Sequence, residues 1–503
     1  MATEPVDTHR DAVVAASPSL RNRAATSVRW ATFSTLGSAL LSTLSTVLVA
    51  RVLTVEHMGL AALALLITGL CEIVLDLGLG AAVVKRVSLT DEYLNAVFWL
   101  SSLFSVLMFG AIVLLANAIG TYLNQPELAQ LLNVCSVVLI IGAARIVPFH
   151  LLARELEFNK RAIAELVATA LGTLVTLALL FLNFSYWSII LGLLTRHLVL
   201  SVMIMRATAW RPSLAVDRSS VWPALVDGLP LAGSRVLWYI YTKSSFLIVG
   251  RMLSPTSLGY FTTASTIVDI FAARLGGVIN LVSFPVFSKL QEHSVQRRSA
   301  YLQVTRLTAV VMTPTLLGIA LVADLAVSVV LTNKWLPMTP VLQAFCVLGL
   351  ATAVTSLTPW MLVSLQRQRN VLLFDATCAL LIPLSVLVFI KFGMVAAVLA
   401  HAFTYLLLIT MLSHRLFRII NVTWREYSVA LSPALGIALV IAFCVSAVKH
   451  ATQDVSDAVS LVLCIFAGII CTTGYLWLAH RPVLLELTSL IPIRRLAPRR
   501  KHQ

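Results

Sequence analysis

The sequence contains few charged residues for its length. Of its 503 residues, 12% are charged and 59% are hydrophobic, and the mean hydropathy is +0.92. So little charge cannot cover the surface of a soluble globular protein of this size. Apolar runs of about 20 residues recur along the chain, and each is long enough to cross a hydrocarbon layer as a helix. The sequence therefore predicts a multi-pass membrane protein.

Patterns typical of several other classes are also missing. Alternation of apolar and polar residues with period two is absent, which excludes a transmembrane β-barrel. The seven cysteines lie in apolar runs, with no CxxC pair and no histidine at metal spacing, so we expect neither a disulfide nor a metal site. The Walker A, GxSxG and HExxH motifs are absent, so we expect a transporter and not an enzyme, with no cofactor.

Fourteen apolar segments have the length of a membrane-spanning helix. The predicted fold is therefore an all-α polytopic membrane protein with about 14 transmembrane helices. The polar stretch 323–339 is expected to lie on the surface and not to span the membrane. The predicted spans are residues 30–50, 59–84, 94–116, 128–148, 163–182, 186–205, 225–249, 258–287, 301–322, 340–365, 371–390, 394–413, 428–448 and 458–478.

The net charge of +15 is spread along the chain. Most of the 37 Lys and Arg residues lie in the two tails and in the loops after every second predicted span. The positive-inside rule places these regions in the cytoplasm, so we expect both termini there. The closing residues RRLAPRRKHQ are expected to contact anionic membrane lipids. No nucleic-acid-binding module accompanies the basic residues, so we exclude nucleic acid as a partner.

One short segment occurs twice, 200 residues apart. VARVLTVEHMGL at 49–60 is similar to VGRMLSPTSLGY at 249–260, and Arg51 and Gly59 correspond to Arg251 and Gly259. An even number of spans separates the copies, so both halves enter the membrane in the same direction. This arrangement predicts two parallel lobes with a cavity between them. Chance matching is the alternative, because apolar helices use few residue types.

The spans and the repeat together predict the domain organisation. Six spans form each lobe, and two further spans follow the repeat. The predicted regions are a cytoplasmic polar tail 1–29, an N-lobe 30–206, a basic cytoplasmic linker 207–224, a C-lobe 225–415, two additional spans in 416–480 and a basic cytoplasmic tail 481–503.

The repeated segment and its neighbours resemble a known family. ARVLTVEHMGLAALALLITG (50–69), DLGLGAAVVKR (76–86), VGRMLSPTSLGYF (249–261) and FPVFSKLQ (284–291) are similar to Wzx-type polysaccharide flippases. These form the polysaccharide transporter branch of the multidrug/oligosaccharidyl-lipid/polysaccharide exporter superfamily. The resemblance covers roughly residues 30–413 in layout and implies a fold of two six-helix bundles.

The resemblance also implies an activity. Such a flippase moves an undecaprenyl-diphosphate-linked oligosaccharide from the inner to the outer leaflet of the bacterial inner membrane, by alternating access between its lobes. The product would serve exopolysaccharide or lipopolysaccharide biosynthesis. The implied partners are this lipid-linked oligosaccharide, membrane lipids, a polysaccharide polymerase and the export machinery.

Five cationic residues lie within the predicted spans. A charge that faces lipid at the bilayer centre costs about 2.5–3.5 kcal/mol, so these side chains should face a polar interior. Guanidinium groups bind phosphate oxygens as a fork, so we predict a substrate-binding cavity for a diphosphate. The alternatives are snorkelling to the membrane surface and internal ion pairs that only hold helices together. The five are Arg145, Arg196, Arg235, Lys243 and Arg274.

Acidic residues within the spans are candidates for ion coupling. Glu72 and Asp76 lie four residues apart on one helix face, where two like charges favour binding of a proton or a cation. With Asp269 they are the predicted sites for coupling to protons or sodium. Alternatively, Asp76 caps the glycine-containing end of its helix. Asp375 and His401 are weaker candidates.

Other functions fit the sequence less well. Multidrug antiporters of the same superfamily typically carry an acidic residue in their first helix, whereas residues 30–50 contain no charge. A flippase for peptidoglycan precursors would share both substrate chemistry and fold. A membrane polysaccharide polymerase or ligase would be expected to have a large outer loop, and the predicted outer loops are short.

Overall fold

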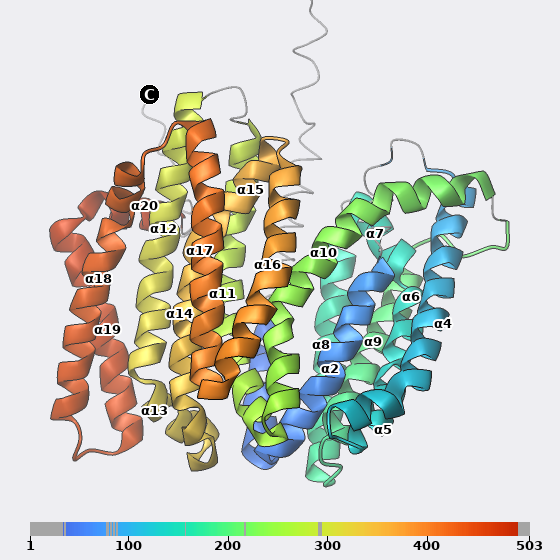
Figure 1. The fold of residues 1–503 in the computed structure, drawn as a ribbon, viewed down its shortest axis with the longest axis horizontal. Helices are drawn as coiled ribbons and strands as arrows, with labels where there is room; N and C mark the ends of the chain where they lie inside the picture. Colours follow the sequence, from blue (N-terminus) through green and yellow to red (C-terminus); the bar gives the residue numbers. More distant parts are fainter. Residues whose placement is uncertain are drawn as a thin grey trace, which may run out of the picture. The chain divides into compact units, whose positions relative to one another are not determined.

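The computed structural model of the chain consists of helices, and the residues that it describes contain no strand (Figure 1). The described residues are 34, 37–76, 80, 83, 86, 89–155, 157–215, 218–289 and 294–490. For 76, 218–221, 223–232, 273–289, 294–295 and 487–490 the description is limited to the backbone. The predicted tail 1–29 and the segment RRLAPRRKHQ lie outside the described residues.

The helices follow the predicted spans along the chain. Among the described residues, ten helices are long and apolar enough to cross a membrane, or eleven if a bent pair is one span. The predicted all-α polytopic fold is thus confirmed. In order the helices are Gly37–Val52, α2 (Val55–Asp76), α4 (Asp91–Tyr122), α5 (Glu127–Cys135), α6 (Val137–Ala143), α7 (Ile146–Arg154), α8 (Phe158–Phe181), α9 (Trp187–Ala207), α10 (Arg218–Met252), α11 (Pro255–Lys289), α12 (Ser294–Leu321), α14 (Thr339–Thr355), α15 (Leu357–Ser364), α16 (Gln368–Phe389), α17 (Met394–Ile420), α18 (Trp424–Ala451) and α19 (Asp457–Ala479).

Shorter elements occupy the polar stretches. The predicted surface segment 323–339 forms α13 (Ala323–Ala326), a π-helical turn η1 (Val327–Leu331) and a 3₁₀ turn η2 (Asn333–Met338). A last helix, α20 (Arg481–Leu490), follows α19 and is too short to span a membrane.

Local sequence signals set where several helices begin. Thr90 caps α4 by accepting a hydrogen bond from the backbone N–H of Tyr93 (3.3 Å). Thr423 and Glu426 form a reciprocal capping box at the start of α18. Such caps satisfy backbone N–H groups that have no partner within the helix. The caps therefore fix the residue at which α4 and α18 each begin.

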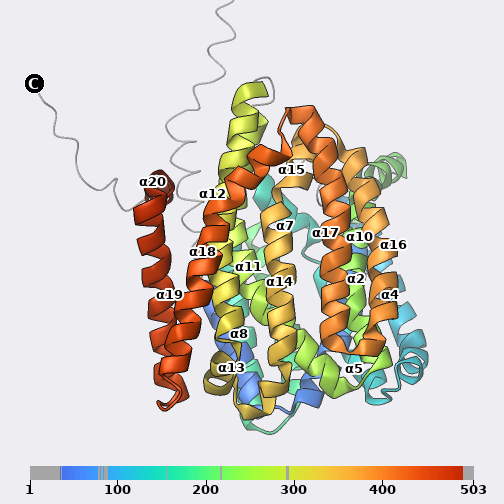
Figure 2. The same cartoon turned by 60° about the vertical axis from the view of Figure 1, so that its left-hand side comes forward.

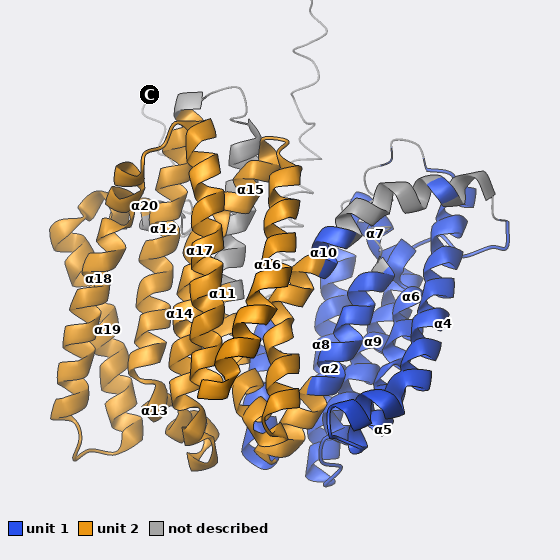
Figure 3. Cartoon of the chain, in the orientation of Figure 1, with its two compact units in different colours: residues 1–53, 63–236 blue, residues 54–62, 237–503 orange. Residues whose placement is uncertain are grey.

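The chain divides into two compact units (Figure 3). Unit 1 comprises residues 1–53 and 63–236, and within it α8 packs closely along α9. Two glycines allow this approach, because a Cβ atom on Gly192 would lie 2.9 Å from the carbonyl oxygen of Gly172 and 1.8 Å from Thr176 Oγ1. Small residues at such positions let helix backbones approach in a membrane protein.

Unit 2 comprises residues 54–62 and 237–503. In it α11, α12, α14, α16 and α17 run side by side, and α18 packs along α12 (Figure 2). An aromatic group stabilises its interior: Phe261 lies edge-on to Phe246 at 5.1 Å and to Phe345 at 4.8 Å between ring centroids. Such pairs add about 0.5–1.5 kcal/mol to the gain from burial.

The repeated sequence segment contacts its own second copy, and this contact lies inside unit 2. A Cβ atom on Gly59 would lie 2.1 Å from the carbonyl oxygen of Pro255, and a Cβ on Gly259 would lie 2.1 Å from that of Val55. Residue 55 corresponds to 255 and residue 59 to 259, so the contact is reciprocal. This is the geometry of a two-fold symmetric interface, formed here within one chain.

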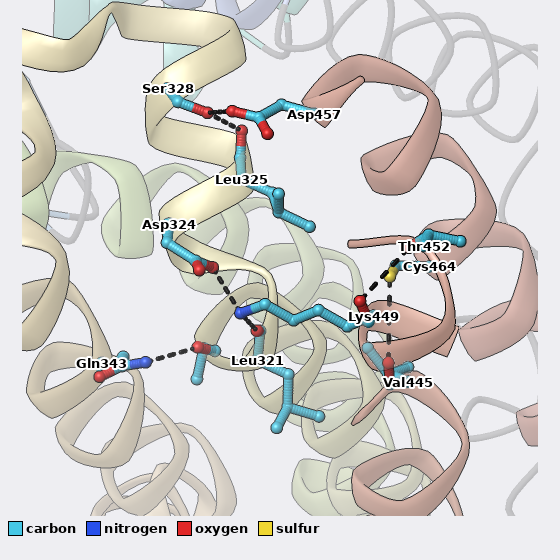
Figure 4. Close-up of polar contacts among 11 residues, drawn as sticks. Leu321, Asp324, Leu325, Ser328, Gln343, Val445, Lys449, Thr452, Asp457 and Cys464 are labelled. Carbon is cyan, nitrogen blue, oxygen red and sulfur yellow. Dashed lines mark hydrogen bonds and ion pairs between the residues drawn. The ribbon is translucent and has the colours of Figure 1, made fainter. Parts of the chain in front are cut away.

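Polar contacts fasten α18 and α19 to the segment after α12 (Figure 4). Lys449 donates to Asp324 Oδ1 (2.7 Å) and to the carbonyl oxygen of Leu321 (3.2 Å). Ser328 donates to Asp457 Oδ2 (2.8 Å). We call this group the α13 clamp. It joins the last two spans to the rest of unit 2 at the end where η1 and η2 lie.

Substitution of either junction glycine should destabilise the protein. We expect Gly59→Ala and Gly259→Ala each to lower the free energy of unfolding by about 1–3 kcal/mol, because the added methyl group meets a backbone carbonyl that cannot move aside. Gly110→Ala in α4 is the matched control, since its Cβ meets no atom within 4 Å. That control should be neutral or slightly stabilising. Equal effects of all three on unfolding in detergent would contradict the tight junction.

Candidate functional site

Arg145 lies where a membrane helix bends. The pair formed by 127–143 and 146–154 is bent by 44°, and Arg145 is the residue that precedes α7. A break of this kind leaves backbone groups without intrahelical partners, which proteins tolerate inside a bundle or beside a polar cavity. The guanidinium group of Arg145 therefore extends from the break between two helices of unit 1.

The side chains of His197 and Glu72 gather around Arg145. Arg145 Nη1 donates to His197 Nδ1 at 3.0 Å. A guanidinium can only donate, so Nδ1 is the acceptor and the proton of this imidazole is on Nε2. Glu72 Oε1 lies 3.7 Å from the same Nδ1, which is beyond hydrogen-bond distance. The carboxylate of Glu72 therefore acts on the group through its charge, chiefly on Arg145.

Arg196 completes this group from α9. It interacts electrostatically with Glu72, and its side chain is exposed. Gly172 on α8 makes room for it, because a Cβ there would lie 2.7 Å from Arg196 Cβ. We name Glu72, Arg145, Arg196 and His197 the unit 1 polar cluster. With neutral His197 it holds two positive charges and one negative charge.

In unit 2, Lys243 has an acidic neighbour from another helix. Lys243 Nζ on α10 lies 3.8 Å from Asp269 Oδ2 on α11. Ser265 Oγ also donates to this oxygen (3.3 Å), and the ammonium group lies 4.8 Å from the centre of the Phe246 ring. The side chain of Asp269 is 62% exposed, so the pair is weak and open to a ligand. Lys243, predicted to bind substrate, thus lies beside Asp269, predicted to serve ion coupling.

The remaining predicted site residues are described less fully. Arg235 is exposed on α10. Asp76 and Arg274 belong to α2 and α11, and their side chains lie outside the described part of the structure. Among the described residues, no group of three His, Cys, Asp or Glu side chains could hold a metal ion.

Unit 2 also contains a buried polar network that the sequence indicated only in part. Asp375 on α16 is buried and interacts electrostatically with Tyr241 and Tyr405. Nearby, His401 Nδ1 and Ser245 Oγ are 3.1 Å apart, and Thr355 Oγ1 lies 3.2 Å from the hydroxyl of Tyr405. Hydroxyl groups at helical spacing in an apolar span give little signal in a sequence, so the tyrosines were not predicted.

The comparison with known families decides the identity of the chain. A family model described as polysaccharide biosynthesis protein matches residues 48–340. The chain belongs to this family. WzxC, a lipopolysaccharide biosynthesis protein of Escherichia coli K12, is 27% identical over 67% of this chain and 69% of its own length. ExoT, a succinoglycan biosynthesis transport protein of Rhizobium meliloti, is 24% identical over 66% and 68%.

The teichuronic acid biosynthesis protein TuaB of Bacillus subtilis is 22% identical over 75% of this chain and 78% of its own. These relatives confirm the resemblance to Wzx-type polysaccharide flippases. The chain is accordingly a multi-pass transporter of polysaccharide biosynthesis and not an enzyme.

Solved structures show the same fold. The lipid II flippase MurJ in an inward closed conformation matches 90% of this chain and 99% of its own, with a TM-score of 0.73 and 15% identity. An inward-facing multidrug resistance MATE transporter matches 75% and 95%, with a TM-score of 0.56 and 16% identity. At such identities the likeness concerns the fold alone. It is the fold of the multidrug/oligosaccharidyl-lipid/polysaccharide exporter superfamily.

The charges of the unit 1 polar cluster should prove energetically coupled. In a double-mutant cycle of Glu72→Gln and Arg145→Gln, we expect a coupling free energy of about 1 kcal/mol. The value stays moderate because the side chain of Glu72 is 37% exposed. Unfolding of purified protein in detergent gives the four free energies.

A surface pair on α8 provides the control for this cycle. Lys160 and Glu157 form an ion pair with side chains 46% and 35% exposed, and their coupling should stay below about 0.5 kcal/mol. If the two cycles gave the same coupling, the cluster would contribute no more than a surface ion pair.

Proposed function

We propose that the protein is a flippase for a lipid-linked oligosaccharide. It moves an undecaprenyl-diphosphate-linked repeat unit from the inner to the outer leaflet of the bacterial inner membrane, for exopolysaccharide or lipopolysaccharide biosynthesis. The observation that carries the proposal is the unit 1 polar cluster, in which two arginines lie within apolar helices of a polysaccharide-transporter chain. Both termini are proposed to be cytoplasmic, in accord with the distribution of Lys and Arg.

The chemistry of the cluster suits a diphosphate. A guanidinium group can donate two parallel hydrogen bonds to the oxygens of a phosphate. The attraction between the two charged groups is stronger where little water is present. The hydrogen bond from Arg145 Nη1 to His197 fixes the orientation of the guanidinium plane of Arg145. The side chain of Arg196 is exposed and is available to a ligand. In the proposed mechanism these two groups, with Arg235, Lys243 and Arg274, neutralise the diphosphate while it crosses the apolar layer.

Glu72 is the proposed coupling group of the cluster. Its carboxylate faces the charges of Arg145 and Arg196, so it competes with an anionic substrate for them. Binding of a proton at Glu72 would remove this competition and make the cluster more cationic. Asp76 and Asp269 remain further candidates for coupling to protons or sodium.

Alternating access of two lobes is the proposed mode of transport. The duplicated junction supports it, because Gly59 and Gly259 contact each other's copy reciprocally, as expected of two related halves. We assign the halves to residues 30–206 and 225–415, joined by the linker 207–224, with two additional spans in 416–480. Repeats of this parallel kind build transporters around a central substrate site.

The sidedness of the lipid-linked intermediate in cells tests the function directly. In spheroplasts of cells that lack this protein, we expect the intermediate to accumulate where a glycan-binding lectin in the medium cannot reach it. Return of the gene should restore labelling. If the intermediate reached the outer face normally without the protein, a role in drug efflux or polymerisation would replace the flippase.

Removal of single cations among the proposed substrate-binding residues should reduce export without loss of the protein. We expect Arg196→Gln and Arg235→Gln each to lower export at least tenfold, because a hydrogen bond to a charged group contributes about 1.5–3 kcal/mol. Arg415→Gln, an exposed position on α17, is the control and should export normally. Membrane levels of each variant are measured in parallel. Normal export by both the Arg196 and the Arg235 variant would show that these arginines have a structural role alone.

A further inference from the structure

A cavity with polar and apolar walls lies in unit 2, and it shares no lining residue with the charged groups proposed above for substrate binding and ion coupling. Its volume is about 810 Å³, and it opens where α12, the start of α18 and α20 meet. Figure 1 shows α20 at the end of unit 2 where α17 passes into α18. Ser299, Gln303 and Arg306 line it from one face of α12, and Arg425 and Glu486 line it from α18 and α20.

Arg306 has donor groups left over in this cavity. Its Nη2 atom donates to both oxygens of Glu486, at 2.8 and 3.1 Å. Its Nε atom is buried and has no hydrogen-bond partner. A buried donor is stabilised by an acceptor, and an oxyanion bound beside this edge of the guanidinium would supply one. The carboxylate of Glu486 thus binds only Nη2 of the Nε and Nη2 pair, whereas a larger oxyanion would bind both atoms.

Arg425 adds a second cation whose charge is not balanced by an ion pair. Among the described residues it forms none. The neighbouring Glu426 is already engaged, since it accepts from Arg298 and from the backbone N–H of Thr423 (3.0 Å). Both carboxylates at the cavity are therefore held by arginines, while Arg425 is exposed. This excess of donors favours an anion over a cation or a basic peptide.

The position of the cavity identifies the source of the anion. Leu302 and Val429 form an apolar part of its lining, and Val429 is 63% exposed. Trp424 and Tyr427 stand at the start of the apolar helix α18, where aromatic side chains typically mark the membrane interface. A ligand with a phosphate head and an apolar body fits this lining better than free phosphate does.

We propose that this cavity binds the phosphate headgroup of an anionic membrane phospholipid through Arg306 and Arg425, and that the bound headgroup replaces Glu486 on Arg306. In this exchange a phosphate takes the place of the Glu486 carboxylate on the guanidinium group of Arg306. It loosens α20 without detaching it, because the ion pair between Arg306 and Glu486 is lost while Val483 stays packed in a core cluster with Leu307 of α12. The attachment of α20 therefore depends on the lipids around the protein.

Binding of phospholipid to the purified full-length protein tests this proposal without any transport assay. Short-chain phosphatidylglycerol is titrated in detergent, with phosphatidylethanolamine and inorganic phosphate as separate arms, and the shift in unfolding temperature is measured. We expect phosphatidylglycerol alone to stabilise the protein in a saturable manner. An equal shift with phosphatidylethanolamine, or saturation by inorganic phosphate at the same concentration, would overturn the assignment to an anionic lipid.

Variants separate specific binding from general attraction to negative lipids. Arg425→Gln should weaken binding at least tenfold, whereas Arg418→Gln, exposed on the last turn of α17, should change it less than twofold. Lys449→Gln opens the α13 clamp and loosens α18 at its other end, so it should also leave lipid affinity unchanged. Equal weakening by all three would overturn the proposal, because a diffuse or indirect effect would then explain it.

The exchange on Arg306 has its own signature. Glu486→Gln removes the competing carboxylate, so it should tighten lipid binding several-fold even though it breaks an ion pair of the fold. A purely structural role of this pair predicts the opposite, since loss of α20 packing would weaken binding or leave it unchanged. That result would refute the exchange.

Discussion

A cation within an apolar helix needs a partner, and this constraint shapes both units of the protein. Arg145 is placed at a helix bend and donates to His197, with the carboxylate of Glu72 close by. Lys243 lies beside Asp269 and above the ring of Phe246. These arrangements make the charges tolerable inside a membrane while leaving part of each group accessible. The proposed transport of an anionic substrate needs both properties at once.

The spans could be predicted because hydropathy and length alone define a membrane helix. The partners of the charged residues could not, because each pair joins helices that are distant in sequence. Glu72 on α2 interacts with Arg145 at the helix bend, and neither sequence segment contains a signal for the other. The bend does have a local signal, because Pro148 in the first turn of α7 has no N–H to donate to the carbonyl group of Ala144 at the break.

Sequence spacing was also a limited guide to ionic partners. Asp269 was expected as an ion-coupling residue and Lys243 as a substrate-binding residue, yet they lie together. Helical geometry relates residues of one helix well, but it contains no information about the neighbouring helix. The reciprocal junction is the exception, since the two segments in contact are related by a repeat that is visible in the sequence.

The contact between Gly59 and Gly259 has a consequence for the history of the chain. Each glycine faces the backbone of the other copy, so the same surface serves as both halves of one interface. A self-complementary surface of this kind is what allows two separate, identical molecules to associate. The junction is therefore the part of the present chain through which an ancestor with one copy of the segment would have formed a homodimer. Fusion of two such genes would then have required no new contact at this point.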